Sequence, residues 1–201
     1  MRLGVLGGTF DPVHYGHLRL AESAREADGL SLDKVLFIPA GQPWRKSDRA
    51  VSPPKQRAMM LSLAIEGNDA FEMSTMEIER EGPSYTVETL EMLHREYGGG
   101  EFFLIMGEDA LSDLPNWRKP ERIISLAHLA VASRREDGAG MFERPEVLPR
   151  EALDRLVRVP MEAIEISGSR IRERVRRRRS IRYLVPEPVR LYIEDHGLYR
   201  E

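Results

Sequence analysis

The sequence contains no cysteine, which excludes disulfide bonds, thiolate metal sites and a thiol nucleophile. No apolar run approaches the roughly 20 residues that a membrane-spanning helix needs, and the first residues, MRLGVLGG, lack the apolar stretch of a secretion signal. Positive charge is not in excess either, because 30 lysines and arginines face 33 aspartates and glutamates, for a formal net charge of -3. We therefore expect a cytoplasmic protein that binds neither membrane nor nucleic acid.

Two familiar nucleotide-binding motifs are also missing. The glycines of GVLGGTF lack the spacing of the G-x-G-x-x-G dinucleotide fingerprint, and the phosphate-binding pattern G-x-x-x-x-G-K-[ST] occurs nowhere. What is present is the balance of a globular protein, with 41% hydrophobic and 31% charged residues in 201 positions. That length supports one substantial core, so we expect a single domain over residues 1–201.

Short apolar runs alternate along the chain with amphipathic stretches, a rhythm typical of a parallel sheet covered by helices. The pattern predicts an α/β fold: a Rossmann-like open parallel sheet with helices on both faces, over about residues 1–160, and a small C-terminal helical part over about 161–201. Five buried strands are expected, at 3–6, 35–39, 102–106, 128–133 and 156–160, with helices at 17–27, 54–67, 85–98, 120–126 and 185–199.

The stretch GGTFDPVHYGH, residues 7–17, follows the first predicted strand and opens the first predicted helix. Ligands of open α/β sheets bind at the carboxyl ends of strands, where glycine loops and helix N-termini present N–H groups to phosphate. His14 and His17 are three residues apart, so both rings lie on one helix face beside the loop, as a polyanion site needs. Zinc is the alternative use of this pair, but the Glu of H-E-x-x-H and a third ligand are missing.

A second candidate anion site is ISGSRIR, residues 166–172. Ser169 is expected to N-cap a helix that begins at about Arg170, whose free N–H groups would face phosphate together with Arg172. An ordinary capped helix is the alternative. The arginine run at 176–179 is most simply a solvated face, with a phosphate or nucleic-acid role as the alternative.

These two stretches resemble the two signature motifs of the HxGH nucleotidyltransferase superfamily, with His14, Gly16 and His17 on its defining triplet. Further segments resemble the bacterial nicotinate-nucleotide adenylyltransferase family over nearly the whole chain: PAGQPWRK (39–46), PSYTVETL (83–90), GEDA with a later tryptophan (107–117) and YLVP (183–186). In the first segment Trp44 and Arg45 replace the family's usual proline and histidine, so only the role of Lys46 transfers cleanly.

The resemblance implies an enzyme of NAD biosynthesis that transfers the adenylyl group of ATP to nicotinate mononucleotide, by direct attack and without a covalent intermediate. Mg²⁺ would enter with ATP, held mainly by substrate phosphates rather than by protein ligands. The catalytic residues would be His14 and His17. The implied ATP-binding residues are Gly7, Gly8, Thr9, Phe10, Gly107, Asp109, Ser167, Ser169 and Arg172. Those implied for nicotinate mononucleotide are Arg45, Lys46, Tyr85, Thr86, Trp117 and Arg134.

Three alternatives stay open at the level of sequence. An adenylyltransferase for nicotinamide mononucleotide or phosphopantetheine would share the ATP motifs, a nucleotide sensor would bind without turnover, and the arginine run could serve nucleic acid. Homo-oligomer formation, selectivity for the acid over the amide, and the role of Trp44 are not decided by the residues.

Overall fold

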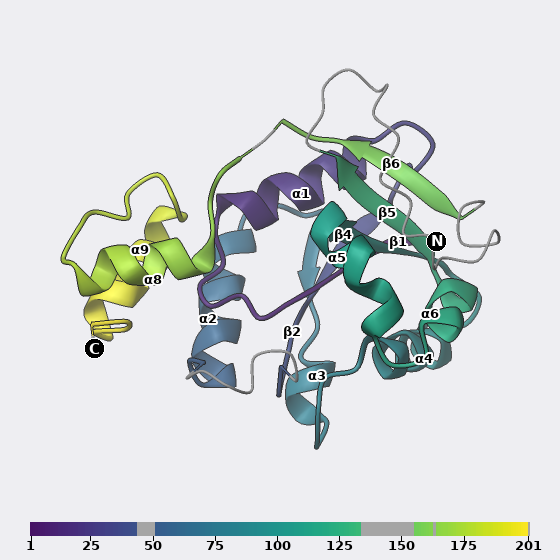
Figure 1. Cartoon of the computed structure of the whole chain (residues 1–201), viewed down its shortest axis with the longest axis horizontal. Helices are drawn as coiled ribbons and strands as arrows, with labels where there is room; N and C mark the ends of the chain where they lie inside the picture. Colours follow the sequence, from purple (N-terminus) through teal and green to yellow (C-terminus); the bar gives the residue numbers. More distant parts are fainter. Residues whose placement is uncertain (44–50, 134–154, 163, 201) are drawn as a thin grey trace.

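The computed structural model describes residues 1–43, 51–133, 155–162 and 164–200 (Figure 1). In this part of the chain a parallel six-stranded sheet has the strand order β3-β2-β1-β4-β5-β6. The order runs outward in both directions from the β1–β4 pair, which is the point where ligands bind in open α/β sheets. The strands are β1 (Arg2–Gly8), β2 (Lys34–Pro39), β3 (Phe71–Met73), β4 (Glu101–Gly107), β5 (His128–Ser133) and β6 (Leu156–Pro160).

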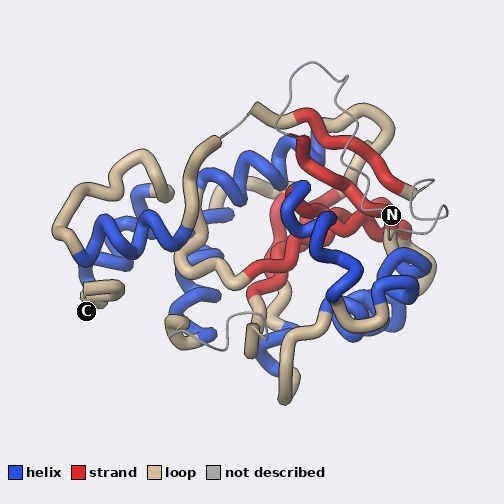
Figure 2. Tube along the Cα trace, in the orientation of Figure 1, coloured by secondary structure: helices blue, strands red, loops and turns tan. Residues whose placement is uncertain are grey.

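Helices cover both faces of this sheet, as Figure 2 shows. One face is packed by α1 (Tyr15–Glu26) and α2 (Pro54–Ile65), and α8 (Gly168–Arg176) and α9 (Glu187–Asp195) extend the same core beyond them. The other is packed by α3 (Met76–Glu79), α4 (Thr86–Tyr97), α5 (Glu108–Asp113) and α6 (Pro120–Leu126), with the short 3₁₀ turn η2 (Leu114–Asn116) between the last two.

The strands are apolar at successive positions because both of their faces are buried. In β2, Val35 and Phe37 belong to the core under α1 and α2, whereas Leu36 and Ile38 belong to the core under α4 and α6. This two-sided burial is the source of the continuous apolar runs in the sequence. The predicted Rossmann-like α/β fold is confirmed.

The C-terminal helices α8 and α9 stand to one side of the sheet, where α9 packs against α2 (Figure 1). Their buried residues, among them Ile171, Val189 and Ile193, belong to the same core as α1 and α2. The division of the chain at about residue 160 stays a prediction. Over the described ranges, no helix has both the length and the apolar character needed to cross a membrane.

The prediction of five strands was wrong by one. The sixth strand, β3, has three residues, FEM, and pairs with β2 at the edge of the sheet. Three half-buried residues leave too short a pattern to be distinguished from a loop. The N-cap position of α2 is occupied by Pro53.

Candidate active site

The site lies where β1, β2 and β4 end. A cavity of about 340 Å³ opens there, bounded by Gly7 and Gly8 of β1, Ala40 after β2, and Gly107 at the end of β4. The backbone N–H of Ala40 donates to the carbonyl of Gly8 at 2.9 Å, which joins the ends of β1 and β2 at the cavity. Short side chains at these strand ends leave room for a ligand against the backbone.

A buried arginine fixes the position of the loop between β1 and α1. Arg57 of α2 is almost inaccessible to solvent, and it donates to the carbonyl oxygens of Ser52 at 2.8 Å, Thr9 at 2.8 Å and Gly41 at 3.2 Å. Burial lowers the pKa of Arg57, and the charge of Asp11 opposes that shift. One guanidinium therefore fixes the ends of two loops that border the cavity.

Asp11 anchors the same loop to the C-terminal part of the chain. Its Oδ1 accepts from the hydroxyl of Tyr199 at 2.6 Å, and its Oδ2 accepts from the backbone N–H of Ser52 at 3.3 Å. Its carbonyl oxygen accepts from Nη1 of Arg172 at 2.5 Å. Burial, and then the charge of Asp11, raise the pKa of Tyr199, so the tyrosine acts as a hydrogen-bond donor.

The two histidines form a stacked pair at the start of α1. Their ring centroids are 3.7 Å apart with planes inclined by 21°, and His14 occupies the N-cap position. The backbone N–H of His14 donates to Nδ1 of His17 at 3.3 Å, which orients the second ring. Phe10, buried beneath, meets the His17 ring edge-on at 5.0 Å between centroids. The predicted pairing of His14 and His17 on one face is therefore present.

Gly16, between the histidines, is required by this packing. A Cβ at that position would lie 3.0 Å from Nδ1 and 3.1 Å from Cε1 of the His14 ring. A side chain at this position would therefore require the His14 ring to shift by a few tenths of an ångström.

His14 is buried, with 6% of its surface exposed, and burial lowers its pKa from 6.5 to about 4. Its Nδ1 atom has no hydrogen-bond partner among the described residues. The ring is consequently neutral at physiological pH, with hydrogen-bonding capacity left for a ligand. An anion beside the ring would raise this pKa again.

A second cavity of about 200 Å³ adjoins the first. His14, Gly16, Glu108 and Asp109 line it, and α5 brings the two carboxylates there because it begins directly after β4. His17, together with Leu20 and Gly107, lines both cavities. His17 therefore stands at the border between the two cavities, with His14 on the side of the smaller one.

The larger cavity ends at α4 and at Trp117. Thr86 is the first residue of α4 and lines the cavity, as does Trp117, whose Nε1–H donates to Oδ2 of Asp113 at 3.0 Å. This bond fixes the plane of the indole. Tyr85 is half-buried beneath the guanidinium of Arg118, 4.4 Å from its ring centroid, and is not among the residues that line either cavity.

The second signature differs in detail from its prediction. The N-cap of α8 is Ser167, whose Oγ accepts from the backbone N–H of Arg170 at 3.3 Å, so the assignment of Ser169 as the cap was wrong. Ser169 instead lies 3.2 Å from Ser167, hydroxyl to hydroxyl, and is exposed. A Cβ on Gly168 would approach the carbonyl oxygen of Asp11 to 3.0 Å. The two motifs are thus in direct contact.

Sequence reasoning missed several residues that shape the site. Ser84 is buried, and its Oγ accepts from the backbone N–H of Gly41 at 2.9 Å, which ties the loop after β2 to the segment before α4. Buried Glu77 lines the larger cavity and accepts from the hydroxyl of Thr89 at 2.5 Å. Of the residues missed, only Arg57 could have been noticed in the sequence, because it occupies a position on the apolar face of α2 beside Met60 and Leu61. The predicted residues Arg45, Lys46 and Arg134 lie outside the described residues.

A glycine loop and paired histidines at the carboxyl edge of a parallel sheet are the features of a nucleotidyltransferase. A family model described as cytidylyltransferase-like matches residues 5–174. The chain is 48% identical to a probable nicotinate-nucleotide adenylyltransferase of Thermomicrobium roseum, over 99% of this chain and 92% of the relative. It is 46% identical to the corresponding protein of Roseiflexus sp. strain RS-1, over 98% of both chains.

Among solved structures, the nicotinic acid mononucleotide adenylyltransferase of Plasmodium falciparum, complexed with NaAD, shares this fold with a TM-score of 0.75. That alignment has 16% identity and covers 98% of this chain and 96% of that one. Full-length identity to the curated relatives is the stronger finding. The chain belongs to the nicotinate-nucleotide adenylyltransferase family, as the segments at 39–46, 83–90, 107–117 and 183–186 predicted.

Proposed function

We propose that this protein transfers the adenylyl group of ATP to nicotinate mononucleotide, giving deamido-NAD and pyrophosphate. The observation that carries the proposal is the position of His17 at the border of two adjoining cavities at the carboxyl edge of the sheet. A reaction between two bound nucleotides needs this arrangement, because the reacting phosphates must meet where both substrates end.

In the proposed reaction, a 5′-phosphate oxygen of nicotinate mononucleotide attacks the α-phosphorus of ATP. A new P–O bond forms, the bond from the α-phosphorus to the α,β-bridging oxygen breaks, and pyrophosphate leaves in line with the attack. The attacking phosphate is already ionised at neutral pH, so the reaction needs no general base and no covalent enzyme intermediate. Catalysis then comes from positioning and from stabilising charge on the phosphoryl oxygens.

The neutral His14 and the partly exposed His17 are suited to donate hydrogen bonds to those oxygens. At the N-terminus of α1 the N–H groups of Tyr15 and His17 donate to the carbonyl oxygens of Leu184 and His14, which leaves the N–H of Gly16 for a phosphate oxygen. Asp109, in the smaller cavity, is assigned to the ribose hydroxyls of ATP, since a carboxylate after a strand accepts hydrogen bonds well there.

The phosphates that follow in ATP are assigned to the second signature, through Ser167, Ser169 and Arg172. The carbonyl oxygen of Asp11 accepts from Arg172, so this guanidinium lies against the histidine loop, and its positive charge is assigned to the phosphates. The backbone of Gly7, Gly8, Thr9, Phe10 and Gly107 is also assigned to ATP. Gly107 lines both cavities, whereas Gly7, Gly8 and Thr9 line the larger one, so ATP would extend past His17 to the ends of β1 and β4. Buried Phe10 contributes through the position of His17.

The larger cavity is assigned to nicotinate mononucleotide. Trp117 offers an indole face to the pyridine ring, and the N-terminus of α4 at Thr86 offers backbone N–H groups to the carboxylate. Tyr85 contributes as the N-cap residue that sets the start of this helix. Arg45 and Lys46 are assigned to the phosphate and Arg134 to the mononucleotide, on the resemblance alone.

Mg²⁺ is proposed to enter with ATP. Among the described residues no group of three or more histidine, aspartate or glutamate side chains could hold a metal ion. Few protein ligands are needed by an ion that is coordinated mainly by phosphate oxygens and water, as magnesium commonly is. When bound, it would neutralise charge on the leaving pyrophosphate.

A cytoplasmic location stays a prediction.

The test is pyrophosphate release from ATP and Mg²⁺ with nicotinate or nicotinamide mononucleotide offered in parallel. We expect kcat/KM to favour the acid by about a hundredfold, because helix-terminal N–H groups left without the carboxylate are costly. Comparable rates would retain the adenylyl transfer and overturn the specificity. Turnover with phosphopantetheine alone would identify another acceptor, and nucleotide binding without any turnover would identify a sensor. His17→Ala is the control that must lower kcat.

A further inference from the structure

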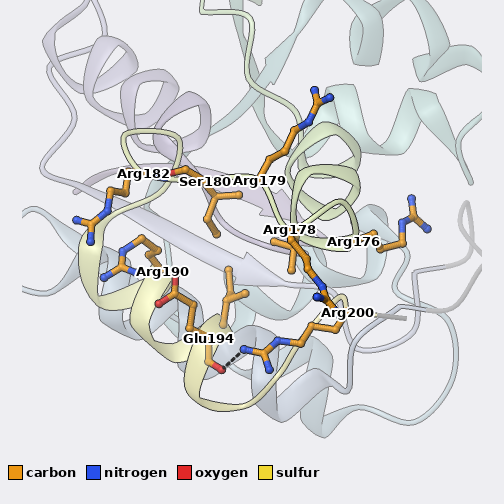
Figure 3. Close-up of a pocket in the computed structure, with 11 residues that line it drawn as sticks. Arg176, Arg178, Arg179, Ser180, Arg182, Arg190, Glu194 and Arg200 are labelled. Atoms are coloured by element: carbon orange, nitrogen blue, oxygen red, sulfur yellow. Dashed lines mark hydrogen bonds and ion pairs between the residues drawn. The ribbon is translucent and has the colours of Figure 1, made fainter.

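A further cavity in the described part of the chain lies away from the active site, between the end of α8, the turn that follows it, and α9. It has a volume of about 640 Å³, within the range of roughly 300–1,000 Å³ that holds small-molecule ligands. Figure 3 shows its lining, in which Arg178 and Arg200 lie together while Arg182 and Arg190 lie on the other side. Arg176 and Arg179 also belong to the lining.

Only some of these arginines are neutralised by acidic residues. Arg190 is bracketed by two carboxylates, at 2.5 Å from both Glu187 and Glu194, and Arg176 lies 2.5 Å from Glu173. A fourth pair joins Arg182 to Glu187 at 3.6 Å. Ion pairs of this kind are common on exposed helix surfaces and add little to stability.

Arg178, Arg179 and Arg200 have no carboxylate partner among the described residues. Arg200 makes one hydrogen bond from its side chain, Nη2 to the carbonyl oxygen of Glu194 at 3.0 Å. Residues 170–200 contain ten arginines and four carboxylates, in a chain whose formal net charge is -3. Positive charge is therefore concentrated at this cavity, and repulsion between unpaired guanidiniums makes a bound anion favourable.

Arg178 also has a backbone conformation that glycine adopts more readily than other residues. Its φ is +53°, in the left-handed region, because it is the residue that closes the C-terminus of α8. Its N–H donates to the carbonyl of Val175 at 2.9 Å, and the N–H of Arg179 donates to the carbonyl of Arg174 at 2.8 Å. This hydrogen-bond pattern ends helices, and its left-handed residue is usually glycine. An arginine here adds backbone strain and contributes a charge to the cavity.

We propose that this cavity binds a compact polyphosphate, a ligand with two or more linked phosphate groups. The number of arginines matches several phosphate charges, since a guanidinium binds phosphate oxygens in pairs. The cavity also has a partly apolar floor, formed by Val175, Ile181 and Ile193. Its concave shape fits a small ligand rather than the extended track along which nucleic acid binds. The proposal is independent of the activity proposed above.

The test is to titrate inorganic tripolyphosphate into the protein and to measure the heat of binding by calorimetry. The salt concentration is about 0.15 M, so that remote surface charges are screened. Arg178→Gly is the decisive variant, because it removes a guanidinium and introduces the residue that suits the left-handed conformation. We expect it to melt at or above the temperature of the wild-type protein while its Kd for tripolyphosphate rises about tenfold, the loss of one charge-assisted contact. Arg122→Ala, an exposed arginine on α6 paired with Glu91, is the matched control and should leave the Kd unchanged.

Tripolyphosphate also resembles the phosphates of ATP, so His17→Ala separates the two sites. Unchanged affinity in His17→Ala with weakened affinity in Arg178→Gly supports the proposal. The reverse pattern, equal affinity in Arg178→Gly and wild type, or no binding by the wild type, overturns it. Competition then identifies the kind of ligand. If GTP displaces bound tripolyphosphate at a lower concentration than a longer inorganic polyphosphate does, the ligand is a nucleotide. The opposite order indicates an inorganic ligand, and both results support the site.

Nucleic acid is the competing occupant, because Tyr183 beside the cavity is 87% exposed and could stack on a base. A single-stranded oligonucleotide that binds more tightly than tripolyphosphate, and loses affinity in Tyr183→Ala, would overturn the proposal of a compact ligand. Tripolyphosphate affinity that is the same in Tyr183→Ala supports it.

Discussion

The low pKa of His14 predicts a specific dependence of stability on pH. Burial lowers this pKa from 6.5 to about 4, so the folded state keeps the ring neutral while the unfolded chain takes up a proton. The contribution of His14 is therefore complete above pH 6.5 and is lost as the pH falls toward 4. A shift of this size corresponds to about 3 kcal/mol in total, of which about 2.5 kcal/mol is lost by pH 4.5.

The measurement compares the free energy of unfolding of the wild type with that of His14→Gln at pH 7.5 and pH 4.5, by urea denaturation. Glutamine cannot titrate, and all other groups contribute alike to both proteins. The wild type should lose about 2.5 kcal/mol more than the variant between these two pH values. The variant itself is expected to be less stable at pH 7.5, which does not affect the difference.

NMR titration of the His14 ring supplies an independent measure of the same pKa. A midpoint near 6.5 in the folded protein, or an equal loss of stability in both proteins, would show that the ring is solvated and refute the reasoning. Addition of pyrophosphate should raise the midpoint, since a nearby anion stabilises the protonated ring.

Three further outcomes are expected. Gly16→Ala should lower kcat at least about tenfold with little change in melting temperature, since its Cβ would lie 3.0 Å from Nδ1 of His14; an unchanged kcat would contradict the importance of the stacked pair. Tyr199→Phe should destabilise the fold by about 2 kcal/mol, the typical value of a hydrogen bond to a charged group, and lower the melting temperature by about 4–8 °C. Tyr192→Phe, whose hydroxyl makes no hydrogen bond in the described structure, is its control, and equal melting temperatures would disprove the role of the bond. Asp109→Asn should raise the KM for ATP several-fold and leave the KM for the acceptor unchanged, as initial-rate kinetics with each substrate varied would show.

The active-site loop illustrates how much local sequence can predict. The spacing of His14 and His17 places both rings on one helix face wherever the helix lies, because three residues span about one turn. The apolar runs predicted five of the six strands, since strands buried on both faces have continuous apolar sequence. The three-residue β3 was missed because it is stabilised by pairing with β2 rather than by its own pattern.

Residues close together in the chain were enough to predict the parallel sheet, the glycine loop at its carboxyl edge and the histidine pair, because each of these features depends on local sequence. The residues that hold and border these features come from distant parts of the chain, so they could be identified from the folded structure but not from local sequence. Tyr199 reaches Asp11 across 188 positions, and Arg57 joins loops that are far apart in sequence. The place of His17 between two cavities likewise depends on how β1, β4 and α1 pack together, since contacts between distant segments leave no local pattern from which they could be predicted.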